Sequence, residues 1–300
     1  MNGIIIIDKP QDFTSFDVVA VVRKTLHEKK IGHSGTLDPM ATGVLPVLVG
    51  RAAKAQSLLP DTDKEYIAGF RFGIATDTLD ITGNILSESE SNVTGDEIQA
   101  VLPRFRGDIM QTPPMYSAVS KNGVRLYELA RKGIEVEREA RPVNISRLEL
   151  LSFDHESQSG RMIISCSKGT YIRVICDDIG KALGCGCVMT GLRRTRACGF
   201  DESDSVTLEA LKEAAENGRA QELLRQTDSI FSCYPAVKIS QGQAVRFMNG
   251  ASLSLDRLHI GGAVSDGGIF RVYGADDIFI GLGVIDIEKE ELAVKKRFCD

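Results

Sequence analysis

Apolar residues recur every three or four positions in several segments, which is the spacing of one buried face of a helix. One such series is Ile172, Ile175, Ile179 and Leu183. Two Thr-x-x-acid sequences, at 14–17 and 94–97, match the capping box that marks the first turn of a helix. The pattern predicts helices that begin after Thr14 and Thr94, and helices over about 124–132, 172–183, 208–217 and 241–249.

Other stretches alternate apolar and polar residues or are rich in β-branched residues, as half-buried strands are. Strands and helices follow one another without the regular strand–helix–strand period of a doubly wound fold. The pattern therefore favours an α+β fold with a mixed, mainly antiparallel sheet and flanking helices. Strands are expected at 66–73, 145–153, 161–167, 268–273, 278–287 and 292–298.

The pattern of predicted elements changes near Cys233, after which short strands separated by glycine and aspartate replace the longer elements. A chain of 300 residues has the length of about two domains. We predict a first domain over 1–230 and a small β-rich second domain over 231–300.

The composition of the chain shows which broad classes of protein it can and cannot belong to. The chain is 43% hydrophobic and 26% charged, which is typical of a folded globular protein and excludes a disordered or coiled-coil chain. No apolar run approaches the roughly 20 residues of a membrane helix, and Ile4–Ile7 is too short for a signal-peptide core. We expect a cytoplasmic protein without a membrane partner, whose seven cysteines are free thiols.

The net charge of −5 argues mildly against a nucleic-acid partner, but the charge is unevenly distributed. Residues 201–230 contain eight acidic and three basic residues, so the first 200 residues are close to neutral. Since nucleic-acid binding needs a local basic face and not a basic chain, an RNA partner stays open.

The densest irregular segment is 32–46, with three glycines and two prolines. That content is incompatible with a regular helix or a central strand, whereas the flanking residues are apolar. We therefore predict a loop held on a packed scaffold, where functional residues concentrate. Asp38 is its only carboxylate. Spacing alone favours a turn-forming role for Asp38 and a structural role for His33 over catalytic ones.

Several common active-site patterns are absent from the sequence. It has no Walker-type phosphate loop and no Gly-x-Ser-x-Gly elbow. The pair Cys185 and Cys187 has one intervening residue and no second pair, so neither a zinc site nor another metal site is expected. Asp77 and Asp80 are interpreted as part of a solvated loop.

Basic and aromatic residues interleave in two places, as they do in proteins that stack on bases and neutralise phosphates. Four acidic residues within 116–147, and Glu149 just after it, accompany the bases, so a solvated helix face is as good an interpretation. The cluster of Arg193, Arg194 and Arg196 contains no acid and is the better candidate for phosphate contacts.

Several short motifs follow one another along the chain. They are 32–39, 41–45, Asp8-Lys9-Pro10, Thr14-Ser15, 63–66, 168–173, 192–194, and, in the tail, 243–244 and 247–250. Together they resemble the TruB family of tRNA pseudouridine(55) synthases, and the tail resembles that family's PUA-like domain. The matches run in family order from residue 3 to about 298, and one departure is Asp12, where the family usually has glycine. Aspartate tolerates left-handed turns, so only a local change is expected there.

This resemblance implies an isomerase that converts a T-loop uridine of tRNA, at position 55, into pseudouridine. It implies a catalytic domain over 1–230, with an insertion over 112–147 that closes over the RNA, and a PUA-like RNA-binding domain over 231–300. The expected partner is the T stem-loop of tRNA, with no obligatory protein partner or guide RNA. No metal or organic cofactor is expected.

The resemblance also assigns roles to single residues. Asp38 would be the nucleophile, Arg173 would pair with it, and Tyr66 would lie against the target base and help remove the proton from carbon 5. The remaining assignments are substrate contacts: His33 in the gap left by the extruded uridine, Tyr171 and Leu192 in the base pocket, and Arg193 and Arg194 on the RNA.

Two other functions fit parts of the sequence. One is a non-catalytic protein that binds or folds tRNA on the same scaffold, although the joint presence of Asp38, Tyr66 and Arg173 favours an enzyme. The other is a phosphotransferase that uses Asp38, but the sequence lacks the phosphate-binding glycines that this chemistry needs.

Overall fold

The computed structural model describes residues 1–261 and 264–299. Its centre is a nine-stranded sheet whose main path runs β1-β3-β12-β4-β11-β10-β7, with β2 beside β3 and β13 beside β12. All pairs are antiparallel except β3 with β12, so the predicted mixed, mainly antiparallel α+β fold is confirmed. The strands are β1 (Gly3–Lys9), β2 (Ile31–His33), β3 (Thr42–Val49), β4 (Lys64–Phe72), β7 (Gly107–Gln111), β10 (Arg141–Asp154), β11 (Ser159–Cys166), β12 (Cys187–Ala197) and β13 (Phe200–Asp201).

Two short hairpins and the helices complete this part of the chain. The capping boxes at Thr14 and Thr94 are formed, as predicted. The helix expected from residue 124 begins two residues later, because Val124–Arg125 pairs with β8 instead. The elements are β5 (Ile74–Thr76), β6 (Ile85–Glu88), β8 (Ser120–Lys121), β9 (Val124–Arg125), α1 (Ser15–Leu26), α2 (Gly95–Val101), α3 (Leu126–Ala130), α4 (Ile172–Leu183), α5 (Leu208–Glu216), η1 (Gly50–Ala55), η2 (Leu102–Phe105), η3 (Glu202–Asp204), η4 (Ala220–Leu223) and η5 (Thr227–Phe231).

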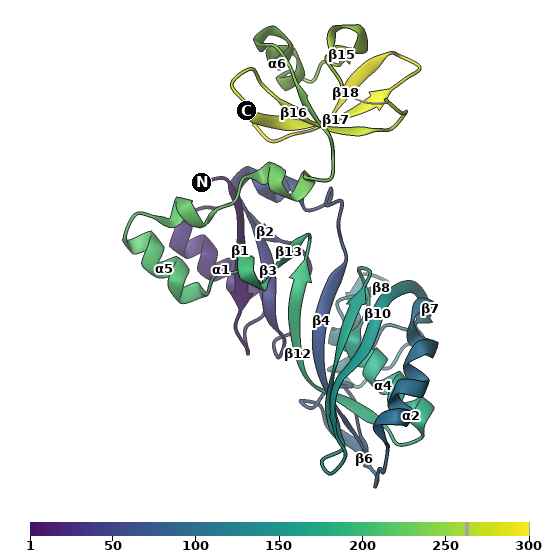
Figure 1. The fold of residues 1–300 in the computed structure, drawn as a ribbon. Helices are drawn as coiled ribbons and strands as arrows, with labels where there is room; N and C mark the ends of the chain where they lie inside the picture. Colours follow the sequence, from purple (N-terminus) through teal and green to yellow (C-terminus); the bar gives the residue numbers. More distant parts are fainter. Residues whose placement is uncertain (262–263, 300) are drawn as a thin grey trace.

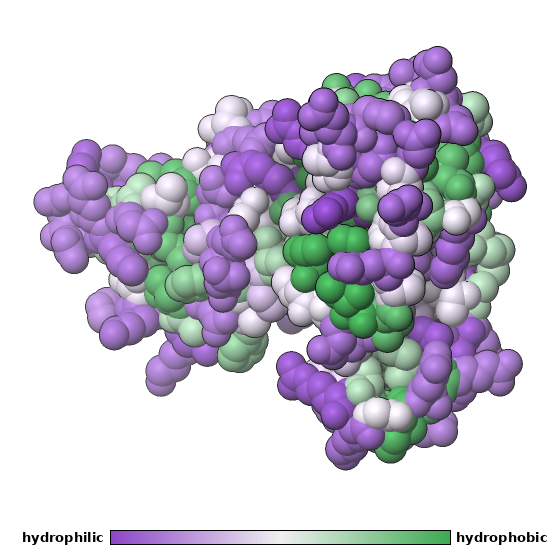
Figure 2. All heavy atoms as spheres, turned by 90° about the horizontal axis from the view of Figure 1, so that it is seen from below, coloured by the Kyte–Doolittle hydropathy of each residue, from purple (hydrophilic) through white to green (hydrophobic). Residues whose placement is uncertain are grey.

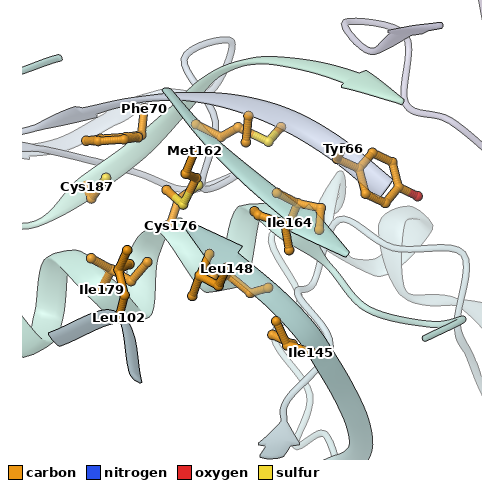
Figure 3. Packing of buried hydrophobic residues seen from close by; sticks show 14 of the residues in the cluster. Tyr66, Phe70, Leu102, Ile145, Leu148, Met162, Ile164, Cys176, Ile179 and Cys187 are labelled. Atoms are coloured by element: carbon orange, nitrogen blue, oxygen red, sulfur yellow. The ribbon is translucent and has the colours of Figure 1, made fainter. Parts of the chain in front are cut away.

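The helices cover the sheet in two groups, each with its own core. Helices α1 and α5 pack against β1 and β3, whereas α2 and α4 lie beside the other half of the sheet (Figure 1). In the second core, Phe70 and Met162 of the sheet face Cys176 and Ile179 of α4 (Figure 3). Tyr66 lies at one end of this cluster with its hydroxyl directed away from the other labelled residues.

The expected loop over 32–46 is shorter than predicted, because Gly43 and Pro46 lie inside β3. The carbonyl of Pro46 accepts a hydrogen bond from Ser34, just beyond the end of β2, and not from β1. In an extended residue N–H and C=O point to the same side, so the missing N–H of proline removes no bond to β1. At Gly43 the backbone of Arg194 lies so close that a Cβ atom would be 2.2 Å from its carbonyl oxygen.

The C-terminal residues form a separate five-stranded sheet with its own core, above the first sheet in Figure 1. The three predicted strands and the predicted helix are present. Phe279 and Phe298 of this part also contact Phe231, which belongs to a core shared with η1. The elements are β14 (Ala236–Lys238), α6 (Gln241–Met248), β15 (Leu253–Ser254), η6 (Leu255–Arg257), β16 (Ile269–Tyr273), β17 (Phe279–Asp286) and β18 (Glu291–Arg297).

The surface that Figure 2 shows is mostly hydrophilic around a limited hydrophobic area. Ile85 and Leu86 on β6 are among the large apolar side chains that are exposed. Within residues 1–261 and 264–299, no helix is long and apolar enough to cross a membrane.

Candidate active site

The Asp38 loop joins β2 to β3 and is anchored to the start of α1. The hydroxyl of Ser15 accepts a hydrogen bond from the amide of Leu37 at 2.8 Å and donates one to its carbonyl at 3.3 Å. The amide of Asp12 donates to the carbonyl of Pro39 at 2.9 Å. Since Ser15 and Leu37 are buried, these bonds hold the backbone on both sides of Asp38.

Lys9 also holds the Asp38 loop in place, through a hydrogen bond from its ammonium to the carbonyl of Pro39. Its side chain has no exposed surface, and its ammonium donates to the carbonyls of Pro10 at 2.9 Å, Phe13 at 2.5 Å and Pro39 at 3.2 Å. Burial lowers the pKa of Lys9 to about 8. Asp12 adopts the left-handed conformation, with φ 64°, so the expected local turn is confirmed.

Arg173, the second residue of α4, pairs with Asp38 as expected. Its Nη2 lies 3.0 Å from Oδ2 of Asp38 and also donates to the carbonyl of Tyr116 at 3.0 Å. Its Nη1 donates to the carbonyl of Thr78 at 3.0 Å and lies 3.4 Å from Oδ2 of Asp80. The guanidinium is buried, whereas 41% of the Asp38 side chain is exposed. The carboxylate is therefore held from one side and open on the other.

The interpretation of Asp80 as part of a solvated loop is wrong. Asp80 is 5% exposed, and its Oδ1 accepts hydrogen bonds from the hydroxyls of Thr78 at 2.9 Å and Thr82 at 2.6 Å. The turn between β5 and β6 folds onto β12, where Ile81 donates to the carbonyl of Met189. Thr78 and Thr82 each lie two positions from Asp80 in the sequence. This spacing, which lets both hydroxyls reach the carboxylate, is the local signal for a bonded aspartate.

Five of the predicted site residues line one pocket of about 310 Å³. Ser117 and Lys64, which the sequence did not single out as site residues, line it as well. Burial raises the pKa of the Tyr66 phenol, and the Arg194 guanidinium acts in the opposite direction. Burial and Arg194 both lower the pKa of Lys64. The five are Asp38, Tyr66, Tyr171, Arg173 and Leu192.

Tyr171 is positioned by Gln111, a second residue that sequence reasoning missed. Gln111 is 3% exposed, and its side-chain amide donates to the carbonyl of Tyr171 at 3.1 Å and accepts from its N–H at 2.8 Å. This pair of bonds ties β7 to the residue before α4. It also fixes the start of the segment 112–147, of which Ser117 and Ala118 reach the pocket.

The three arginines of 193–196, the candidates for phosphate contacts, lie in different environments: Arg194 is buried, whereas Arg193 and Arg196 are partly exposed. Arg194 has no exposed surface, and its guanidinium donates to the carbonyls of Val44 at 2.7 Å and Gly35 at 3.3 Å. Arg193 lies 3.0 Å from Asp8 and 2.5 Å from Glu202. Asp8 is far from these arginines in the sequence and Glu202 follows them closely, but both acids lie outside residues 193–196.

His33 and Arg196 lie outside the pocket. His33 is half-buried on β2, and burial lowers the pKa of its imidazole, which is therefore neutral at pH 7. The side chain of Arg196 is 58% exposed and lies 3.5 Å from Asp61. No group of three or more side chains suited to hold a metal ion occurs in the part of the chain that the structure describes.

Three family comparisons match successive parts of the chain. The family described as "TruB family pseudouridylate synthase (N terminal domain)" matches residues 23–172. "tRNA pseudouridylate synthase B C-terminal domain" matches 173–229, and "Pseudouridine synthase II TruB, C-terminal" matches 235–296.

Curated proteins similar to the chain carry the name "tRNA pseudouridine synthase B". The one from Stutzerimonas stutzeri (strain A1501) is 42% identical over 95% of this chain and 92% of that protein. Those from Azoarcus sp. (strain BH72) and Clostridium tetani are 46% and 43% identical, over 84% and 94% of this chain and 83% and 95% of those proteins.

Solved structures similar to this one include a chain of the "Crystal Structure of a Cbf5-Nop10-Gar1 Complex". It superposes with a TM-score of 0.75 at 29% identity and covers 99% of this chain and 85% of that chain. A chain of the "Crystal structure of the archaeal box H/ACA sRNP Nop10-Cbf5 complex" gives a TM-score of 0.73 at 27% identity, over 99% and 86%.

Proposed function

Because the chain belongs to the TruB family and is a tRNA pseudouridine synthase, we propose that Asp38 is its nucleophile and that its target is uridine 55 of the T loop. The reaction is an isomerisation of tRNA. The bond from the ribose to N1 of uracil breaks, a bond to carbon 5 forms, carbon 5 loses a proton and N1 gains one. The observation that carries the proposal is the contact between Asp38 and Arg173 at the wall of the pocket.

The electrostatics of this contact suit covalent catalysis. The guanidinium of Arg173 stabilises the ionised carboxylate, which is the nucleophilic form. The other guanidinium contacts, with Thr78, Asp80 and Tyr116, hold Arg173 in place. The open side of Asp38 faces the pocket, so a nucleotide that enters it meets the carboxylate directly.

The pocket supports a mechanism with an extruded base. Chemistry on a base requires its removal from the stack, which costs a few kcal/mol and less for a loop uridine than for a paired one. In the proposal Tyr66, Tyr171 and Leu192 enclose the extruded base, and His33 supports the gap that it leaves. Burial raises the pKa of Tyr66, so the base meets a neutral phenol there. In the proposal Tyr66 lies against the base and helps to remove the proton from carbon 5.

A second part of the proposal concerns the rest of the tRNA. Residues 1–230 form the catalytic domain, with 112–147 closing over the RNA, and 231–300 form an RNA-binding domain. A groove of about 480 Å³ between η1 and β18 supports this division. Its wall contains Lys54, Lys295, Lys296 and Arg297, whose charges suit a phosphate backbone. Since its substrate is tRNA, we assign the enzyme to the cytoplasm.

The nucleophile is tested by Asp38→Asn, because asparagine keeps the shape of the turn residue but is a far poorer nucleophile. With the purified chain and a bare tRNA transcript, we expect parent folding and tRNA affinity but only background pseudouridine. Single-turnover product formation, binding and thermal melting are measured in parallel. Activity of the parent on the bare transcript also tests independence from a guide RNA or a protein partner.

Two outcomes would contradict the proposal. Substantial turnover by Asp38→Asn would return Asp38 to a structural role. A parent chain that is active only after addition of a guide RNA or another protein would remove the stand-alone function.

A further inference from the structure

Ser117 is one of the residues that line the Asp38 pocket. The residue is 5% exposed, and its Oγ has no hydrogen-bond partner among the described residues. A buried hydroxyl without a partner costs free energy, and such groups are rare in folded proteins. An unpaired hydroxyl in a ligand pocket is therefore expected to find its partner on the ligand.

The backbone of Ser117 is held on both sides, so the hydroxyl has a fixed place. Its amide donates to the carbonyl of Met115 at 2.9 Å, and its carbonyl accepts from the amide of Tyr127 at 3.1 Å. The preceding carbonyl, of Tyr116, accepts from the same Arg173 nitrogen that contacts Asp38. Ser117 is therefore connected to the Asp38 carboxylate through one guanidinium group.

The other buried polar side chains of this wall are already engaged. Arg173 makes contacts with both of its terminal nitrogens, and Tyr66 interacts with Arg194. The half-buried Thr170 and Lys64 donate to the carbonyls of Ser167 and Thr62. Ser117 thus differs from its neighbours in having its hydrogen-bonding capacity unused.

We propose that the Ser117 hydroxyl hydrogen-bonds the target uridine when it occupies the pocket. A hydroxyl both donates and accepts, so it suits either the uracil edge or the ribose 2′-hydroxyl. The inference rests on the proposed function only in that the target uridine enters the Asp38 pocket. It adds a substrate-binding residue from the segment 112–147.

The test uses Ser117→Ala, which removes the hydroxyl and little else. If the hydroxyl bonds the substrate and no group of the protein, its removal should lower activity without lowering the melting temperature. The melting temperature should equal or exceed that of the parent, because an unpaired buried group is removed. Single-turnover kcat/KM on a T-arm RNA should fall roughly three- to tenfold, the value of one hydrogen bond. Ser87→Ala, an exposed serine of β6 outside both the pocket and the segment 112–147, is the matched control and should behave as the parent.

A T-arm RNA with 2′-deoxyuridine at the target position identifies the partner atom. If the contact is to the ribose, the fold losses of kcat/KM caused by Ser117→Ala and by the deoxy substrate should not multiply when the two are combined. If the contact is to the uracil edge, they should multiply. Either result supports the proposal.

Parent kcat/KM for Ser117→Ala overturns the inference, and so does a loss of activity together with a lowered melting temperature, since that pattern belongs to a structural serine. Asp38→Asn separates the two proposals. If Asp38→Asn is inactive and Ser117→Ala is fully active, only the inference fails. If both retain turnover, the proposed site itself fails.

Discussion

Lys9 is a buried cation whose ammonium donates hydrogen bonds to three backbone carbonyls. Its position explains why a lysine precedes Pro10 in the turn: the ammonium joins the β1–α1 turn to the carbonyl of Pro39, next to Asp38. Burial lowers its pKa from 10.5 to about 8. Burying the charged ammonium therefore lowers the free energy of unfolding by an amount that depends on pH.

This cost predicts an unusual pH dependence. Between about pH 8 and 10.5 the folded chain binds fewer protons at Lys9 than the unfolded chain. The Lys9 contribution to stability therefore rises with pH across this window, and its burial costs most below about pH 8. We expect the free energy of unfolding of the parent, relative to Lys9→Met, to increase from pH 7.5 to about 10. Denaturant unfolding of both proteins measures it, and a constant difference would contradict the lowered pKa.

At the scale of elements, β12 carries three arginines with three different environments. Arg193 is bound by two carboxylates, Arg194 is buried beneath the Asp38 loop, and Arg196 is largely exposed. Because successive residues of a strand point to opposite faces, a cluster in the sequence is divided between the core and the surface. The register shift between Arg194 and Arg196 separates them further.

These different environments predict a large loss of stability for a substitution at Arg194 and almost none for one at Arg196. Arg194→Met leaves the carbonyls of Val44 and Gly35 without a donor, and we expect a loss of more than about 2 kcal/mol in the free energy of unfolding. Arg196→Ala should change stability by less than about 0.5 kcal/mol. If Arg196 contacts a phosphate, the slope of log K against log salt for tRNA should flatten by roughly 0.7 to 0.9. Equal stability of both variants would show that Arg194 is not a packing residue.

At the scale of the whole molecule, the two sheets meet at a shared core around Phe231, and the basic groove lies at the same junction. Lys54 reaches it from η1 and Lys295 from β18. Folding of both parts is thus needed to bring these charges together. In the proposed function, a tRNA whose T loop enters the Asp38 pocket would have to extend beyond the nine-stranded sheet to reach these charges.

The groove predicts a dependence on substrate length. Lys54→Ala combined with Lys295→Ala should weaken binding of full-length tRNA and flatten its salt slope by roughly 0.7 to 0.9 per lost contact. Binding of an isolated T-arm RNA should be unchanged. Lys289→Ala, at an exposed lysine in the turn between β17 and β18 that pairs with Asp286, is the control. Equal weakening for both RNAs would place these lysines near the T loop instead of in a distal groove.

The sequence alone determined most local elements and the place of Asp38 as the only carboxylate of residues 32–46. Capping boxes at Thr14 and Thr94, the apolar face of α4 and the alternation of the strands are local signals, because neighbouring residues fix them. The pairing of Asp38 with Arg173 was implied by family resemblance and not by spacing, since 135 positions separate the two residues in the sequence.

Only the tertiary structure decided which polar groups are buried and which charges meet. Asp80, Gln111 and Ser117 become site residues because the β5–β6 turn, β7 and the segment after it fold against α4 and β12. Arg194 loses its exposure because β3 crosses beside β12 at Gly43. Burial and long-range pairing depend on segments far apart in the chain, and no local pattern records them.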